Sequence, residues 1–447
     1  MEGRTHVPVV DEALCGVCGV CRGACPALGS PDLLEGESDT MRAALASQAD
    51  AGQSELAPCQ DACPLGQDIN GYLGALAKGA QTDALEIILR DNPLPSVLGQ
   101  VCHHPCQQAC FSSPVQRPPS IRDLKRFAAQ APRPVPVLPS GYPLAKVAIV
   151  GAGPAGLAAA WELARRGAKA VVFDAQPMAG GMLAWAIPDF RLPRQDLQRD
   201  LDYVAAHGVE FKLGHALRPE EVAALREEYD AVILACGAPL AQKAGLPGEE
   251  LPGVYQGLDF LRDTALCKPP KLKAPVVVVG GGNVALDAAR EALRRGLPVT
   301  LAYRRDREQM PAYAEELAAA EAEGLNFVFR VQPVALQRGE GGGVTSLTVQ
   351  GTQPGAPGAD GRVAFQPDGA PPRQLEAGSV ILALGQKSEA EAWQNGLALD
   401  GLQGDARGRL APGLYVAGDL ASGPATVVQA MAGGIKAARA IMEEVQS

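Results

Sequence analysis

The chain contains two long stretches in which apolar runs, glycines and amphipathic segments follow one another in the same order. The first, 147–174, reads VAIV, then glycines, a segment with helical periodicity, the run VVF and an acid. The second, 275–306, reads VVVV, then glycines, a helical segment and the run VTLAY. Short apolar runs bounded by glycine predict buried strands, and the periodic segments predict helices. The pattern therefore predicts an α/β protein with two Rossmann-like units.

The glycines of the first stretch have the spacing of a dinucleotide-binding turn. Gly151, Gly153 and Gly156 follow the predicted strand and open the predicted helix, so the backbone can approach a pyrophosphate at the helix N-terminus. Asp174 ends the next strand 23 residues after Gly151 (174 minus 151), where a carboxylate would bind the ribose hydroxyls of an adenosine. An ordinary glycine-rich turn is the alternative, and the complete order of elements disfavours it.

The second stretch repeats the turn but not the acid. Gly280 and Gly282 form the turn, and Ala285 stands where a third glycine would allow close helix packing. Arg304 and Arg305 occupy the register of the missing carboxylate. Two guanidinium groups suit the 2'-phosphate of NADP, whereas NAD would favour a carboxylate, so we favour NADP over NAD. A solvated basic turn is the alternative.

A further carboxylate, Asp419, follows a predicted strand and Gly418 near the C-terminus. It can bond ligand hydroxyls, and a helix expected to start near Thr426 would direct its N-terminal amides to the same place. A solvent-facing capping aspartate is the alternative. Elsewhere we expect helices over 69–90, 121–130, 194–207 and 311–323, a strand ending at 237, and surface hairpins over 338–372.

Nine of the eleven cysteines lie between residues 15 and 110 and indicate metal ligands. The candidate ligands are Cys15, Cys18, Cys21, Cys25, Cys59, Cys63, Cys102, Cys106 and Cys110. The first four have the C-x2-C-x2-C-x3-C-P spacing of bacterial ferredoxins. Zinc is a weaker alternative, because a zinc site usually pairs two C-x2-C knuckles across a longer gap. His103 and His104 lie among these cysteines, and we interpret them as polar turn residues.

Composition and charge narrow the class of protein. A net charge of -10 gives no basic footprint for nucleic acid, so we expect no such partner. The N-terminus has acids and no apolar segment, and the apolar runs end well before the roughly 18 residues of a membrane span. We therefore expect a cytoplasmic protein without membrane segments. After the first glycine motif only the isolated Cys236 and Cys267 follow, which disfavours a disulfide-reductase mechanism.

With these motifs placed, residues 55–447 resemble the pyridine nucleotide-linked flavoproteins typified by the glutamate synthase small subunit and the N-terminal half of dihydropyrimidine dehydrogenase. The motifs that carry the resemblance are PCQDACP, GQVCHHPCQQAC, GAGPAG, GGMLAWAIPDFRLP, GGGNVALDAAR, AYRRDREQMP and VAGDLASGPATVVQAMAGG. The resemblance implies a glutathione reductase-like fold with FAD, NADP(H) and two 4Fe-4S clusters. FAD is implied at Gly151, Gly153, Pro154, Gly156, Asp174, Gly181, Leu183, Gly418, Asp419 and Thr426. NADP(H) is implied at Gly280, Gly282, Asn283, Val284, Arg304 and Arg305.

Proline-rich segments at 116–119 and 132–139 place a domain boundary near residue 140, and we expect three domains. These are a helical iron-sulfur domain with a ferredoxin-like motif over 1–140, an FAD-binding domain over 141–250 and 376–447, and an NAD(P)-binding domain over 251–375. The chain departs from the family in two places. It lacks a C-x2-C pair just before PCQDACP, and it has Lys125 where the family places a Gln or Glu ligand.

The expected activity is electron transfer. Hydride would pass between NAD(P)H and FAD, and single electrons would pass through the clusters to or from a partner. Ferredoxin or a larger metalloenzyme or reductase subunit would be the partner. The alternatives are the small subunit of a glutamate synthase and a non-catalytic subunit that carries its cofactors to support a complex.

Overall fold

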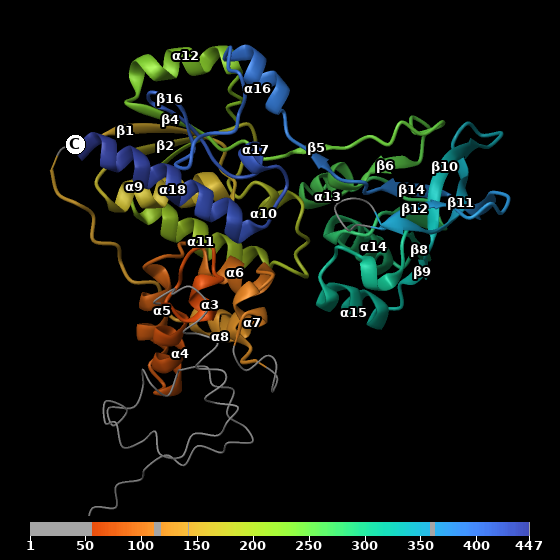
Figure 1. Ribbon diagram of the computed structural model, residues 1–447, viewed down its shortest axis with the longest axis horizontal. Coiled ribbons are helices and arrows are strands. Elements are labelled where there is room, and N and C mark those ends of the chain that lie inside the picture. Colours follow the sequence, from red (N-terminus) through yellow and green to blue (C-terminus); the bar gives the residue numbers. More distant parts are fainter. Residues whose placement is uncertain (1–55, 111–117, 142, 358–362, 447) are drawn as a thin grey trace, which may run out of the picture.

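The computed structural model describes residues 56–110, 118–141, 143–357 and 363–446. The ferredoxin-like run with Cys15, Cys18, Cys21 and Cys25 lies outside these residues. Three parts are visible in Figure 1: a helical domain, a first α/β unit above it, and a second α/β unit beside the first.

The first α/β unit is a six-stranded sheet in the order β16-β17-β4-β1-β2-β3. Its strands are β1 (Lys146–Val150), β2 (Lys169–Asp174), β3 (Glu210–Leu213), β4 (Ala231–Leu234), β16 (Arg409–Ala411) and β17 (Leu414–Val416). All neighbours are parallel except the pair of β16 and β17. The carboxyl ends of β1, β2 and β17 therefore meet at one edge, where ligands bind in open α/β sheets.

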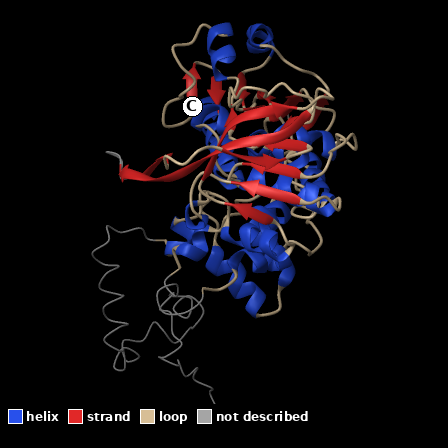
Figure 2. Ribbon diagram, turned by 90° about the vertical axis from the view of Figure 1, so that its right-hand side faces the viewer, coloured by secondary structure: helices blue, strands red, loops and turns tan. Residues whose placement is uncertain are grey.

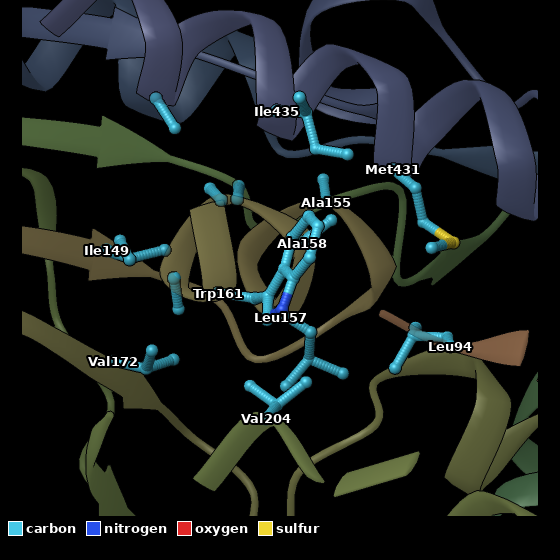
Figure 3. Packing of buried hydrophobic residues seen from close by; sticks show 14 of the residues in the cluster. Leu94, Ile149, Ala155, Leu157, Ala158, Trp161, Val172, Val204, Met431 and Ile435 are labelled. Atoms are coloured by element: carbon cyan, nitrogen blue, oxygen red, sulfur yellow. The ribbon is translucent and has the colours of Figure 1, made fainter. Parts of the chain in front are cut away.

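Helices cover both faces of this sheet. They are α9 (Pro154–Arg165), α10 (Met182–Trp185), α11 (Arg194–Ala206), α12 (Pro219–Glu228), α16 (Ala390–Gly396), α17 (Asp419–Ser422) and α18 (Val427–Gln446). Because the strands are apolar on both sides, α9, α11 and α18 bury one face and α12 and α16 the other. Helix α9 is buried from Ala155 to Ala164, and Figure 3 shows Trp161 between the sheet and the neighbouring helices.

The second α/β unit combines a parallel and an antiparallel sheet. The parallel sheet has the order β6-β14-β7-β8-β9, with β6 (Val254–Gln256), β7 (Val276–Val279), β8 (Val299–Ala302), β9 (Asn326–Val328) and β14 (Ser379–Leu382). Its helices are α13 (Gly257–Ala265), α14 (Asn283–Arg294), η2 (Arg307–Gln309) and α15 (Ala314–Ala322). The antiparallel sheet is β10 (Val331–Arg338), β11 (Val344–Pro357), β12 (Val363–Pro367) and β13 (Arg373–Glu376). It packs on the face of the parallel sheet opposite α14, and its outer ribbon projects from the molecule (Figure 2).

Strand β14 lies in this second sheet, paired with β6 and β7. The sequence analysis expected the chain to return to the FAD-binding domain at residue 376. Strand β14 follows that residue, and it still belongs to the second unit. The reason is that parallel pairing across more than 100 residues leaves no local signal in the sequence. The chain passes between the units twice, where β5 (Leu240–Ala241) and β15 (Gln386–Lys387) pair antiparallel.

The helical domain contains α3 (Pro58–Asp61), α4 (Ile69–Ala77), α5 (Gln81–Leu89), α6 (Pro95–Val101), α7 (Pro105–Gln108) and α8 (Ile121–Ala128). The single helix expected over 69–90 is two helices, because the chain turns at Gly79 with a φ of 75°. The domain is joined to the first α/β unit through Asp200 of α11. This buried carboxylate accepts a hydrogen bond from the Val97 amide in the first turn of α6 (2.8 Å) and pairs with Arg133 (2.6 Å).

Candidate functional site

The first glycine turn connects β1 to α9 and has no room for side chains. Gly151 has a φ of 115°, and a Cβ there would lie 2.3 Å from the carbonyl oxygen of Ala235. A Cβ on Gly156 would lie 1.9 Å from the carbonyl oxygen of Gly151. The turn therefore needs glycine at both positions, and it brings the first amides of α9 to the carboxyl edge of the sheet.

A second backbone segment lies against this turn. Gly181, with a φ of 52°, would place a Cβ 2.7 Å from the Cα of Gly153, and the Gly180 amide donates to the carbonyl of Ala152 (2.9 Å). A side chain at Gly181 would therefore collide with the backbone of Gly153, whereas a Cβ on Gly153 would lie 3.9 Å from Gly181, so the two backbones form one narrow cradle. Pro154 begins α9 at this point, whereas Leu183 is fully buried in the core.

Asp174 lies at the end of β2, as the spacing predicted. Its two oxygens accept hydrogen bonds from the amides of Ala152 (2.7 Å) and Gln176 (2.8 Å). Burial raises the pKa of this carboxyl group, and the two amides lower it. The carboxylate thus braces the glycine turn, and its remaining lone pairs can accept from ribose hydroxyls.

Asp419 begins α17 at the same edge of the sheet. Its Oδ1 is buried and has no hydrogen-bond partner among the described residues, and burial raises the pKa of the carboxyl group. Gly418 precedes it with a φ of 67°, and a Cβ there would lie 2.8 Å from the Cβ of Ala155. Thr426 begins the last helix, because its Oγ1 accepts from the Gln429 amide (3.4 Å). A buried acceptor beside a glycine cradle fits a polyhydroxylated nucleotide such as FAD.

The second glycine turn connects β7 to α14 and repeats this geometry. Gly280 has a φ of 141° and would clash with the carbonyl oxygen of Ala383 at 2.3 Å if it carried a Cβ. A Cβ on Gly282, by contrast, would meet nothing within 4 Å. Asn283 begins α14, and its Oδ1 accepts from the Tyr313 amide (3.1 Å). Val284 follows Asn283 and packs near Gly257, because a Cβ on Gly257 would lie 3.3 Å from Val284 Cγ1.

Arg304 and Arg305 follow β8 at the carboxyl edge of the second sheet. Arg304 is exposed and Arg305 is half-buried, and neither forms an ion pair with a carboxylate of the described residues. The Nε of Arg305 is buried without a hydrogen-bond partner among those residues. Their neighbours are different, because Arg307 pairs with Glu321 (2.7 Å) and Arg330 with Asp306 (2.5 Å). Arg305 also hydrogen-bonds the side chain of Tyr303. Two guanidinium groups without a carboxylate partner among the described residues fit a phosphate at this edge.

An ion-pair network that the sequence analysis did not identify joins the two α/β units. Arg191, in the loop after α10, lies 2.6 Å from Asp287 and 2.9 Å from Glu316. Asp287 is on α14, and burial raises the pKa of its carboxyl group to about 7. Phe190 packs beneath the guanidinium of Arg290. Arg191 lies in the motif IPDFRLP and Asp287 in GGGNVALDAAR. Their presence in these motifs is the only feature of the sequence that could have indicated the ion pair.

The helical domain packs three cysteines with Tyr72. Cys63 and Cys106 are buried in the same cluster as Tyr72, and the partly buried Cys59 packs against that cluster. Burial is the main cause that raises the pKa of the Tyr72 hydroxyl. Cys63 accepts from Gln67 Nε2, and Cys102 accepts from the His104 amide, both at 3.4 Å. Cys110 is buried as well.

These cysteines form no disulfide, and no three metal-binding side chains of the described residues converge as a site for one metal ion. In a 4Fe-4S cluster each thiolate binds a different iron, so its ligands are more widely spaced than those of one ion. A buried group of thiols that already accept hydrogen bonds fits such a cluster.

Residues 145–434 match the pyridine nucleotide-disulphide oxidoreductase family. The chain belongs to this family. Residues 39–134 match the 4Fe-4S cluster domain known as dihydropyrimidine dehydrogenase domain II. This member of the family is therefore an NAD(P)H-dependent FAD oxidoreductase with an iron-sulfur domain, as the sequence motifs predicted.

The similarity to individual proteins is extensive. The chain is 39% identical over 426 residues to the NADP(+)-dependent formate dehydrogenase subunit beta of Moorella thermoacetica, with 86% of this chain and 59% of that protein covered. It is 34% identical over 418 residues to the glutamate synthase [NADPH] small chain of Escherichia coli, with 86% and 88% covered. The fold matches Mycobacterium tuberculosis FprA in complex with NADPH, with a TM-score of 0.58, 21% identity, and 68% and 85% covered. These relatives confirm the family resemblance and the fold class.

The described residues contain no redox-active disulfide, although the family is named after one. Cys236 and Cys267 are the only cysteines within residues 145–434, and they form no disulfide. Burial raises the pKa of Cys236 to about 12, which keeps the thiol protonated and unreactive. In addition, no helix among the described residues is long and apolar enough to cross a membrane.

Proposed function

We propose that this chain oxidises NADPH at the second glycine turn and passes the electrons through FAD and the iron-sulfur domain to a partner protein. The observation that carries the choice of NADPH is the pair of arginines after β8 that have no carboxylate partner among the described residues. A 2'-phosphate would receive charge-assisted hydrogen bonds from Arg304 and Arg305, and NADH has no group to offer them.

The test of this proposal is the coenzyme preference of the double variant Arg304→Ala, Arg305→Ala. We expect the KM for NADPH to rise about 100-fold or more, because two charge-assisted hydrogen bonds contribute about 1.5–3 kcal/mol each. The KM for NADH should change less than threefold. Arg307→Ala is the matched control, because it removes a positive charge from the same loop that is already paired with Glu321. Equal effects on both coenzymes would refute the assignment.

The first glycine turn is proposed to hold FAD. The backbone of Gly151, Gly153 and Gly156 would receive the pyrophosphate, and Asp174 the adenosine ribose. The unpartnered Oδ1 of Asp419 would accept from a hydroxyl of the remaining chain of FAD. When bound, FAD supplies the exchange between two-electron and one-electron transfer. The residues of this chain bind and orient it, and none is needed as a general acid or base.

The electron path beyond the flavin is proposed to use 4Fe-4S clusters. Cys59, Cys63, Cys102 and Cys106 would ligate one cluster, with Cys110 as a further candidate. The ferredoxin-like cysteines Cys15, Cys18, Cys21 and Cys25 would ligate a second. Helix α6 supports this route, since it ends at Cys102 and packs against α11 and α18 of the first unit.

The partner is proposed to be ferredoxin or a larger metalloenzyme or reductase subunit. The chain spans only 59% of the formate dehydrogenase subunit that it resembles, whereas it covers 88% of the glutamate synthase small chain. The latter coverage makes a glutamate synthase small subunit the second candidate. A cytoplasmic location is proposed because the described cysteines are thiols rather than disulfides.

Anaerobic reduction by NADPH separates an electron-transfer enzyme from a non-catalytic assembly subunit. The purified chain should lose its flavin absorbance near 450 nm within seconds of adding NADPH, and a soluble dye should then accept the electrons. A chain that retains FAD but is not bleached by NADPH would exclude the enzymatic function.

A further inference from the structure

A lysine is buried among the cysteines of the helical domain. Lys125 lies on α8 with only 4% of its surface exposed. Ile121 and Ala128 flank it on the same helix face, and both belong to the apolar cluster that contains Cys63 and Cys106. A position with this spacing normally carries an apolar residue, so the ammonium group needs a physical reason to be there.

No carboxylate of the described residues forms an ion pair with Lys125. The arginines of the same region are paired with acids: Arg122 with Glu315, Arg126 with Asp123, and Arg133 with Asp200. Among the ion pairs of the described residues none includes Lys125. Burying a charge without an opposite charge is strongly unfavourable, so a domain that keeps this lysine must provide an anion by other means.

The anion is provided by sulfur. The face of α8 that carries Lys125, between Ile121 and Ala128, packs into the buried cluster that contains Cys63 and Cys106, and the partly buried Cys59 packs against the same cluster. A thiolate-ligated 4Fe-4S cluster carries net negative charge, which increases by one when the cluster accepts an electron. The ammonium therefore interacts more strongly with the reduced cluster than with the oxidised one.

We propose that Lys125 is the built-in charge partner of the 4Fe-4S cluster ligated from these cysteines, and that it raises the reduction potential of that cluster. A protonated ammonium has no lone pair, so Lys125 acts through its charge and not as an iron ligand. The effect would favour electron transfer from the flavin into the helical domain. This inference rests on the iron-sulfur part of the proposed function.

The experiment is a redox titration of the reconstituted full-length chain under anaerobic conditions, followed by the EPR signal of the reduced cluster. Lys125→Met removes the charge at nearly constant volume, Lys125→Arg retains the charge, and Lys78→Met removes an exposed charge from the same domain. At a fixed potential we expect Lys125→Met to lower the ratio of reduced to oxidised cluster at least tenfold, a shift of about 59 mV for one electron. Lys125→Arg and Lys78→Met should change the ratio of reduced to oxidised cluster less than threefold.

Iron analysis of each variant shows whether the cluster is still bound, which decides how a change in potential or a missing EPR signal is interpreted. If Lys125→Met loses its iron while Lys125→Arg retains it, the charge is required to hold the cluster, which supports the inference. Loss of iron from both variants would mean that the lysine acts by shape or as a ligand and would overturn it. An unchanged potential in an iron-replete Lys125→Met variant would overturn it as well. Mediators and dithionite set the potential without NADPH, so a wrong coenzyme assignment would leave this result unaffected.

Discussion

Replacing Gly434 by Ala should destabilise the FAD-binding domain through one backbone contact. Gly434 lies on α18 where this helix crosses α9, and a Cβ there would stand 2.0 Å from the carbonyl oxygen of Ala155. Ordinary contact begins at 3.4 Å, so the helices would have to separate by about 1.4 Å (3.4 minus 2.0). Figure 3 shows that Ile435 and Met431 of α18 pack over α9 at this crossing, so separation would loosen their contacts too.

The loss of stability expected for Gly434→Ala is the difference between two opposing effects. Over-packing a core costs about 1–3 kcal/mol, and the upper end applies because the obstacle is a backbone carbonyl that cannot rotate away. The higher helix propensity of Ala returns about 1 kcal/mol. We therefore expect a net loss of about 2 kcal/mol. FAD content should also fall, because Gly418, beside the cradle, lies close to Ala155 of α9 and to Gly433 of α18, the two helices that would move apart.

The assay is urea unfolding followed by tryptophan fluorescence, with flavin content measured by absorbance. All three tryptophans, Trp161, Trp185 and Trp393, are buried against the sheet of the first α/β unit, so the signal reports on that unit. Gly74→Ala in α4 is the control, because a Cβ there would meet nothing within 4 Å and the change should not affect this transition. A Gly434→Ala variant with wild-type stability and full flavin loading would refute the reasoning.

Three further predictions concern ion pairs and iron. Arg133→Met should cost about 3–5 kcal/mol in thermal or urea unfolding, because it leaves the buried Asp200 without its cation; a cost below 1 kcal/mol would show that the pair is not needed. Hydrogen bonding from Arg290, with further help from Arg294, lowers the pKa of Glu323 to about 2 from 4.5. Its stabilising effect is therefore complete above about pH 4.5 and lost as the pH falls toward 2, with an upper limit near 3 kcal/mol that partial exposure reduces to about 1–2. Glu323→Gln should thus be less stable than wild type at pH 7 and equal to it near pH 2, and a constant difference across this range would contradict the prediction. Iron and acid-labile sulfide analysis should find about eight of each per chain if both clusters form, whereas about four would mean one cluster.

The sequence predicts the local parts of this structure well and the long-range contacts poorly. Each strand-glycine-helix unit is encoded within about 30 neighbouring residues, so the turns at Gly151 and Gly280 were predicted where they occur. The placement of β14 in the second sheet and the pairing of Arg191 with Asp287 depend on residues about 100 positions apart. Neither leaves a periodicity that could be recognised in one sequence. Lys125 was visible as a departure from the family, but only its burial in the helical domain gives a reason to propose a role for its charge.

The hydrogen bond from Val97 to Asp200 has a consequence for the order in which the protein assembles on the ribosome. Cys102 follows the last residue of α6, and the carboxylate that caps the first turn of this helix, Asp200, lies 103 residues after Val97. At about 5–20 residues per second, roughly 5–20 seconds pass between synthesis of the two residues. During that interval the first turn of α6 lacks this hydrogen bond, so the contact that joins the helical domain to the first α/β unit forms only after α11 has been synthesised.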